Sequence, residues 1–151
     1  MELIDHSYLD ITAIDISPDM LKKAKAKFEH SSIKFLEMDA QNMKFSKDSF
    51  DCIIASLTLS VVPEPDTCLR EMTRVLKKGG QMIIFDKFSP KNKDLSLPKK
   101  FLRPIIRVLG TDIGVNFEEL LLKNNQNLRI EEDKPVMLNG MYRMIIMTKI
   151  C

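Results

Sequence analysis

The sequence predicts an α/β fold with a mostly parallel, doubly wound sheet and a C-terminal antiparallel strand pair. Strand-like apolar segments alternate with amphipathic helix-like segments over residues 11–86, a pattern typical of parallel sheets covered by helices. Near the C-terminus, Asn139-Gly140 separates two strand-like segments, which we expect to pair antiparallel. The 151 residues suffice for one hydrophobic core, so we expect a single domain over residues 1–151.

The first element is a strand over residues 11–16 that ends near a carboxylate and runs directly into a helix. Ser17 is a good N-cap, and Pro18 suits the first helical position, where its missing N–H needs no partner. Asp15 therefore lies at the carboxyl end of a strand, the edge where open α/β sheets bind ligands. This pattern alone leaves two interpretations open: an acceptor for ribose hydroxyls, or a capping or solvated loop aspartate.

A second strand and a second acid follow. The helix predicted over residues 18–29 places Met20 and Phe28 on its apolar face, so we expect both in the core. The strand predicted over residues 33–38 ends before Asp39, and a right-handed βαβ connection brings Asp15 and Asp39 to the same sheet edge. Two acids at one edge can hold the sugar and the exocyclic amine of an adenosine.

The later elements continue the alternation. Residues 50–56 are nearly all apolar, which indicates a strand covered on both faces. The next helix buries the face of Cys68 and Leu69, and we expect Lys77-Lys78-Gly79-Gly80 to cap it. The remaining predictions are strands over 81–85, 128–134 and 141–149 and helical pieces over 97–109 and 117–123.

Composition excludes several classes. The net charge is +2 with acids and bases interspersed, and no nucleic-acid-binding motif is present. The three cysteines form no CxxC pair, which argues against a metal site; Cys52 and Cys68 are predicted to be small buried hydrophobes. The longest apolar run, 53–62, is far too short to span a membrane, and no signal peptide is evident, so we expect a cytoplasmic protein.

With these residues in place, the chain resembles the class I S-adenosylmethionine-dependent methyltransferases. It is similar to members of the methyltransferase type 11 domain that include ubiquinone/menaquinone and phospholipid N-methyltransferase-like enzymes. Four segments carry the resemblance in order: Ala13-Ile14-Asp15-Ile16-Ser17-Pro18-Asp19-Met20-Leu21, Glu37-Met38-Asp39-Ala40, Phe50-Asp51-Cys52-Ile53-Ile54-Ala55-Ser56, and residues 69–80, which hold the string E-x-x-R-V-L-K-x-G-G.

The resemblance implies a Rossmann-like fold with S-adenosylmethionine as cofactor. By it, Asp15 binds the ribose hydroxyls, Ile16 packs on the adenine, Asp39 accepts from the adenine amino group, and the backbone N–H of Ala40 faces a ring nitrogen. Ser56 and Leu57 line the methionine end of the cofactor. The full set is Asp15, Ile16, Asp39, Ala40, Ser56 and Leu57.

One part of the family pattern has no counterpart here. The family's first strand and its glycine-rich loop, E-x-G-x-G-x-G, precede the ribose-binding acid, whereas this chain has no glycine before Gly79. The resemblance therefore implies an N-terminally truncated, incomplete domain. An alternative is a non-catalytic remnant or interaction module. A nicotinamide-binding domain is a further alternative, because Asp15 would also suit that ribose, but Asp39 and residues 69–80 favour the methyltransferase.

The implied reaction is methyl transfer to a small-molecule or lipid-like acceptor, which requires orientation more than a side-chain nucleophile. The candidate bases are His6, Thr58, Ser60 and Tyr142, and none stands out, so no catalytic residue is assigned. The cationic and apolar stretch 97–109 suits a lid over the site or a contact with a membrane surface.

Overall fold

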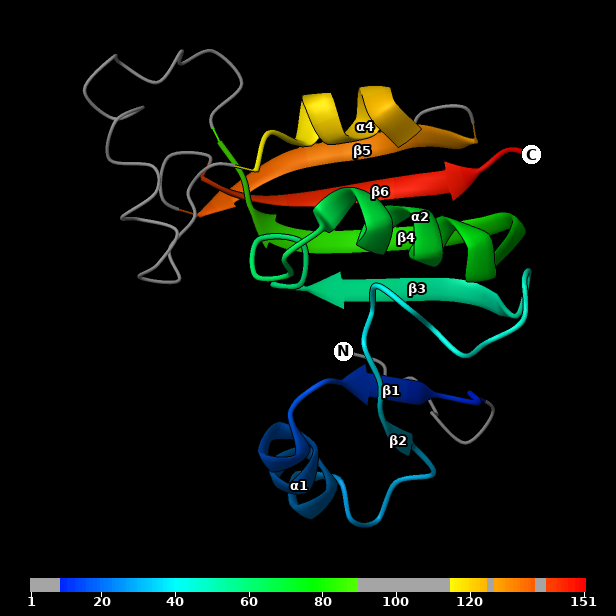
Figure 1. Cartoon of the computed structure of the whole chain (residues 1–151), viewed down its shortest axis with the longest axis vertical. Coiled ribbons are helices and arrows are strands. Elements are labelled where there is room, and N and C mark those ends of the chain that lie inside the picture. The colour runs from blue at the N-terminus through cyan, green and yellow to red at the C-terminus, as the bar shows by residue number, and fades with distance from the viewer. Residues whose placement is uncertain (1–8, 90–114, 125–126, 138–140) are drawn as a thin grey trace, which may run out of the picture. The chain divides into compact units, whose positions relative to one another are not determined.

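The computed structural model describes residues 9–89, 115–124, 127–137 and 141–151 (Figure 1). The chain divides into two compact units, Met1–Lys44 and Phe45–Cys151. The single domain expected over residues 1–151 stays a prediction. The predicted helical stretch 97–109 and the side chain of His6 lie outside the described residues.

The first unit is a βαβ motif. Strand β1 (Thr12–Asp15), helix α1 (Pro18–Lys27) and strand β2 (Lys34–Glu37) follow one another, and the two strands pair in parallel with Asp15 opposite Glu37. The predicted start of the helix is confirmed: the Ser17 hydroxyl accepts a hydrogen bond from the Met20 N–H at 3.3 Å. Cap and proline together explain why the chain turns into a helix directly after β1.

The predicted core face of α1 is only partly buried. Leu21 is buried, but Met20 and Phe28 are 53% and 45% exposed, so the prediction that they join the core is wrong. Within this unit the helix packs on a sheet of only two strands, and such a sheet offers too narrow a face to cover a whole apolar stripe.

The second unit contains a four-stranded sheet in the order β3-β4-β6-β5 (Figure 1). Strand β3 (Phe50–Ser56) pairs in parallel with β4 (Leu76–Lys87). Strand β6 (Tyr142–Lys149) pairs antiparallel with both β4 and β5 (Leu128–Met137), which confirms the expected antiparallel pair. The fold is therefore mixed α/β, with parallel strands followed by an antiparallel ending.

The core of this unit lies between the sheet and two helices. Helix α2 (Pro65–Val75) contacts β4 and also α4 (Phe117–Asn124), and Figure 1 shows both helices on the same face of the sheet. The buried apolar side chains come from every layer, as expected for a single packed core: Leu59, Cys68, Leu69, Met72, Val75, Leu76, Met82, Ile84, Phe117, Leu120, Ile145 and Met147.

Helix α2 ends earlier than predicted, at Val75, and the glycines play a different part. Leu76 is already extended (φ −74°, ψ 135°) and pairs with Phe50, so strand pairing begins where the helix cap was expected. Gly79 has a φ of +77°, which suits glycine, and a Cβ on Gly80 would lie 2.8 Å from the Asp51 carbonyl oxygen. These glycines therefore lie in the part of β4 where its pairing with β3 changes register, between Leu76 and Gln81.

Strand β3 is not covered on both faces, contrary to expectation. Cys52 is exposed and Ile54 is 73% exposed, while Cys68 on α2 is fully buried as predicted. Among the described residues β3 pairs only with β4, and an edge strand has more accessible side chains than a central one.

A buried lysine fastens β6 to the start of the unit. Lys149 is 4% exposed, and its Nζ donates to the Leu76 carbonyl oxygen at 2.6 Å and to Asp48 Oδ1 at 2.7 Å. The hydrogen bond and the positive charge of Lys149 hold the pKa of Asp48 below its ordinary value of 3.8, although partial desolvation opposes them.

None of the helices in the described part of the chain has the length and apolar character needed to cross a membrane.

We expect Leu69→Ala to lower the free energy of unfolding by about 3 kcal/mol, because it leaves a cavity beneath α2 at a fully buried position. Urea unfolding of the full chain measures this change. Leu122→Ala is the matched control, since Leu122 is 75% exposed and its truncation should cost less than about 0.5 kcal/mol. Equal losses for the two variants would contradict the assignment of the core.

We expect Asp48→Asn to cost more stability at pH 7 than at pH 3. A carboxylate whose pKa is lower in the folded chain stabilises it above the unfolded pKa, and this contribution is lost as the pH falls through the folded value. Urea unfolding at both pH values measures the difference. In a Lys149→Met background, Asp48→Asn should cost nearly the same stability at both pH values. If the difference between pH 7 and pH 3 persists in that background, the coupling between Asp48 and Lys149 is refuted.

Candidate functional site

Two carboxylates at neighbouring strand ends share the same local geometry. Asp15 Oδ1 accepts a hydrogen bond from the Ser17 N–H at 2.8 Å, and Asp39 Oδ1 accepts one from the Gln41 N–H at 2.8 Å. Each bond closes a turn between a side chain and the backbone two residues on, which orients the carboxylate. Both aspartates are half-buried, and the strands they follow are paired, since the Met38 N–H donates to the Asp15 carbonyl oxygen.

The two carboxylates differ in what remains for a ligand. Within the described residues Asp15 Oδ2 accepts no hydrogen bond, whereas Asp39 Oδ2 accepts one from the Gln41 side-chain amide at 3.3 Å. The capping and ribose-binding interpretations of Asp15 are thus compatible, because one oxygen serves the turn and the other is available. Next to it, Ile16 is 67% exposed, an apolar surface beside a carboxylate. Ala40 is half-buried and follows Asp39 directly.

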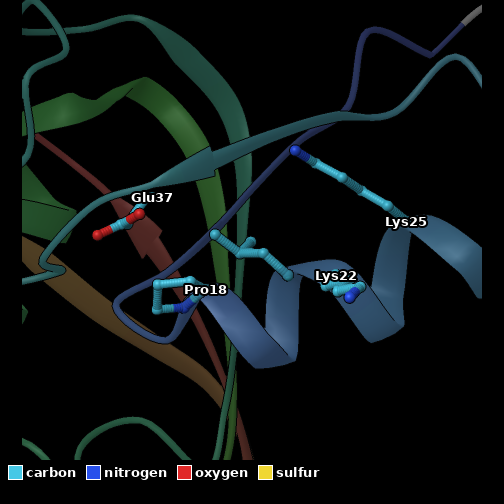
Figure 2. A pocket seen from close by; sticks show the side chains of 5 residues that line it. Pro18, Lys22, Lys25 and Glu37 are labelled. Carbon is cyan, nitrogen blue, oxygen red and sulfur yellow. The ribbon is translucent and has the colours of Figure 1, made fainter.

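A pocket of about 280 Å³ lies between α1 and the end of β2 in the same unit. Figure 2 shows Lys22 and Lys25 on α1, Pro18 at the start of the helix, and Glu37 on β2. Leu21 completes the lining, and none of the six predicted cofactor residues takes part in it. The pocket is thus lined by two cations and one anion over an apolar floor, without the acids that the sequence singled out.

Ser56 and Leu57 belong to the second unit, at the carboxyl end of β3. Both are exposed, and Leu57 has a φ of 52°, a left-handed conformation that costs a non-glycine residue roughly 1 kcal/mol. Its N–H donates to the Phe85 carbonyl oxygen at 2.8 Å. Backbone strain of this kind persists only where surrounding contacts fix it, and it is common at functional sites.

The six predicted residues therefore fall into two groups. Asp15, Ile16, Asp39 and Ala40 lie together at the carboxyl edge of the first unit, and Ser56 and Leu57 lie together at the carboxyl end of β3 in the second. Their part in binding a cofactor stays a prediction.

The candidate bases gain little support from their surroundings. Thr58 Oγ1 donates to the Ser56 carbonyl oxygen at 3.3 Å, and the Tyr142 ring stacks on Phe85 with centroids 5.9 Å apart. The described residues contain no group of three or more side chains that could hold a metal ion. A general base is therefore not assigned.

Besides Lys149, two buried charged residues were not predicted from the sequence. Asp86 is fully buried near the end of β4, where its carboxylate accepts from the N–H groups of Leu59 and Ser60. Arg143, 3% exposed, lies opposite it on β6. The alternation of β4 offered a signal for Asp86, because Met82 and Ile84 share its inward face and the sequence spacing is two.

Arg143 links three elements beside this strand end. Its guanidinium bonds Asp133 on β5 at 2.6 and 3.0 Å and Glu118 on α4 at 2.8 Å. It also lies 5.5 Å from the ring centroid of Phe88 and 5.4 Å from that of Phe117. Desolvation works against its charge, but the two carboxylates outweigh it and raise the pKa of Arg143. The contacts are those of a structural cluster that joins sheet and helix.

Known proteins with similar sequences are methyltransferases. A family model described as a methyltransferase domain matches residues 1–84. Phosphatidylethanolamine N-methyltransferase of Cereibacter sphaeroides is 30% identical over 139 residues, 89% of this chain and 68% of that protein. The ubiquinone/menaquinone biosynthesis C-methyltransferase UbiE of Pseudomonas putida is 32% identical over 90 residues, 57% of this chain but only 35% of that protein. The chain thus spans about a third of the length of the quinone-related relative.

Solved structures share the fold at low sequence identity. A SAM-dependent methyltransferase from Methanosarcina mazei has a TM-score of 0.67 and 19% identity, covering 93% of this chain and 82% of that one. The (4+2)-cyclase SpnF has a TM-score of 0.72 and 17% identity, covering 94% and 67%. These likenesses show the Rossmann-like α/β fold of such proteins. The family model matches more than half of the chain, and this match establishes that the chain belongs to the methyltransferase domain family.

Proposed function

We propose that this chain binds S-adenosylmethionine and takes part in methyl transfer to a small-molecule or lipid-like acceptor. The observation that carries the proposal is the matched pair of carboxylates at the ends of β1 and β2. Both are oriented by the backbone two residues on, and Asp15 keeps one oxygen without a hydrogen bond among the described residues. That arrangement fits a nucleoside, because vicinal hydroxyls donate to a carboxylate in pairs.

The residues present fit the adenosine part of the cofactor. Asp15 would accept from the ribose hydroxyls, and the exposed Ile16 would cover the adenine face. Asp39 would accept from the adenine amino group, although Gln41 already occupies part of that carboxylate. Ser56 and Leu57 would line the methionine end.

When bound, the cofactor supplies an electrophilic methyl group on a sulfonium. The chain's own part is to bind and orient the reactants, which is where most of the acceleration of such displacements arises.

The acceptor class follows from the relatives. The Cereibacter relative is named for phosphatidylethanolamine and the Pseudomonas relative for quinone biosynthesis, so both names point to lipids or lipid-like molecules. We infer the same class for this chain. A cytoplasmic location, and a peripheral membrane contact through residues 97–109, remain predictions that accompany it.

We expect the full chain to bind S-adenosylmethionine in isothermal titration calorimetry, and Asp15→Ala to weaken that binding by roughly 10- to 100-fold. The size follows from losing hydrogen bonds to a charged group. Asp10→Ala is the matched control, because Asp10 belongs to the same unit but pairs with Lys34 on the surface; it should leave the affinity within about twofold.

Absence of binding by the unmodified chain would refute the proposal and favour a non-catalytic interaction module. If binding is found, a radiolabelled methyl-transfer assay on phosphatidylethanolamine vesicles and on a demethylated quinone distinguishes the two acceptor types.

A further inference from the structure

The carboxylate of Asp86 is a buried anion held by backbone amides. The side chain is fully buried, and its Oδ2 accepts from the Leu59 N–H at 2.7 Å and the Ser60 N–H at 3.3 Å, while Oδ1 accepts from the Lys87 N–H at 2.7 Å. Within the described residues it forms no ion pair, although Arg143 lies opposite in register and bonds Asp133 and Glu118 instead. Burying a carboxylate in this way is unfavourable unless its hydrogen bonds are kept.

The amides it binds belong to the turn after β3. That turn starts at Leu57, whose left-handed backbone (φ 52°) is tied to β4 by the bond from its N–H to the Phe85 carbonyl oxygen. The turn then closes on the Thr58 carbonyl oxygen, which accepts from the N–H groups of Val61 and Val62 at 3.2 and 3.1 Å. Two consecutive residues of β4, Phe85 and Asp86, therefore fix the turn on both sides of Thr58.

The arrangement decides which side chains of the turn face outward. Leu59 is fully buried beside the carboxylate, whereas Leu57 is 45% and Val61 is 68% exposed. Releasing the amides of Leu59 and Ser60 removes the contact that holds the turn over the strand end. Leu57 could then relax to the negative φ that leucine prefers.

We propose that Asp86 is a positioning residue for the methionine end of the cofactor site. Its carboxylate holds the turn after β3, so that Ser56 and Leu57 have their binding conformation before the cofactor binds. The inference rests on the proposed function in one respect, since that function makes Ser56 and Leu57 cofactor contacts. Preorganisation of this kind improves binding by lowering the cost of ordering a loop.

The test uses Asp86→Leu in the full chain, with Asp133→Leu as the matched control. Leucine keeps the branched shape of the side chain but has no acceptor, so the Leu59 and Ser60 amides, which share Oδ2, both lose their bond. In ¹H–¹⁵N spectra without cofactor, we expect the Leu59 and Ser60 amide protons to move upfield and the ³J(HN–Hα) coupling of Leu57 to change. We expect the dissociation constant for S-adenosylmethionine to rise about tenfold.

Asp133→Leu also removes a partly buried carboxylate from the same unit, but this carboxylate bonds Arg143. It should lower stability while leaving the Leu57 coupling unchanged and the dissociation constant within about twofold. An equal loss of affinity in both variants, or unchanged Leu57, Leu59 and Ser60 signals in Asp86→Leu, would overturn the proposal.

Two further outcomes are decisive. If the unmodified chain does not bind S-adenosylmethionine, the proposed function fails, and the amide signals alone decide whether Asp86 fixes the turn. If Asp86→Leu does not fold, hydrogen exchange on the unmodified chain replaces it. Protected Leu59 and Ser60 amides support the proposal, whereas exchange as fast as that of the exposed Lys47 amide overturns it.

Discussion

The pairing of β4 with a strand on each side is the constraint on which the rest of the second unit depends. β3 joins it in parallel and β6 antiparallel, so its alternate side chains Met82, Ile84 and Asp86 point into the interior. The first two are fully buried in the core, and the third meets the turn after β3. A single strand with period two thus supplies both the hydrophobic core and the polar anchor of the candidate site.

Much of this arrangement could be predicted because it is encoded locally. The N-cap at Ser17, the alternation of strands and helices, and the two acids at strand ends all follow from neighbouring residues. Asp86 could not be assigned a role in the same way, because the amides it binds lie 26 and 27 residues earlier in the chain. The errors have the same origin: Cys52 and Met20 look apolar locally, but their exposure depends on which strands and helices cover them.

Family and chemistry rest on different observations. The match over residues 1–84 and the 30% identical Cereibacter protein place the chain among methyltransferases. The fold alone would not, since a cyclase superposes on it with a TM-score of 0.72. The chemistry has to be argued from individual residues. The informative ones here are Asp15, whose second carboxylate oxygen is available, and Leu57, whose backbone is strained. The two features lie in separate units, and each is fixed by contacts inside its own unit.

The order of strands in the second sheet has a consequence for how the chain reaches this state. β6 follows β5 in sequence but lies between β4 and β5, so β5 joins the sheet only through β6. The closing contacts are distant, as between Gln81 and Thr148 or Lys149 and Asp48, and such topologies fold slowly. During biosynthesis, β4 would leave the ribosome with one edge open, and Ile145 and Met147 of β6, which are fully buried in the finished protein, would reach their places last. The nascent chain, more than the finished protein, is therefore the form that needs protection by chaperones.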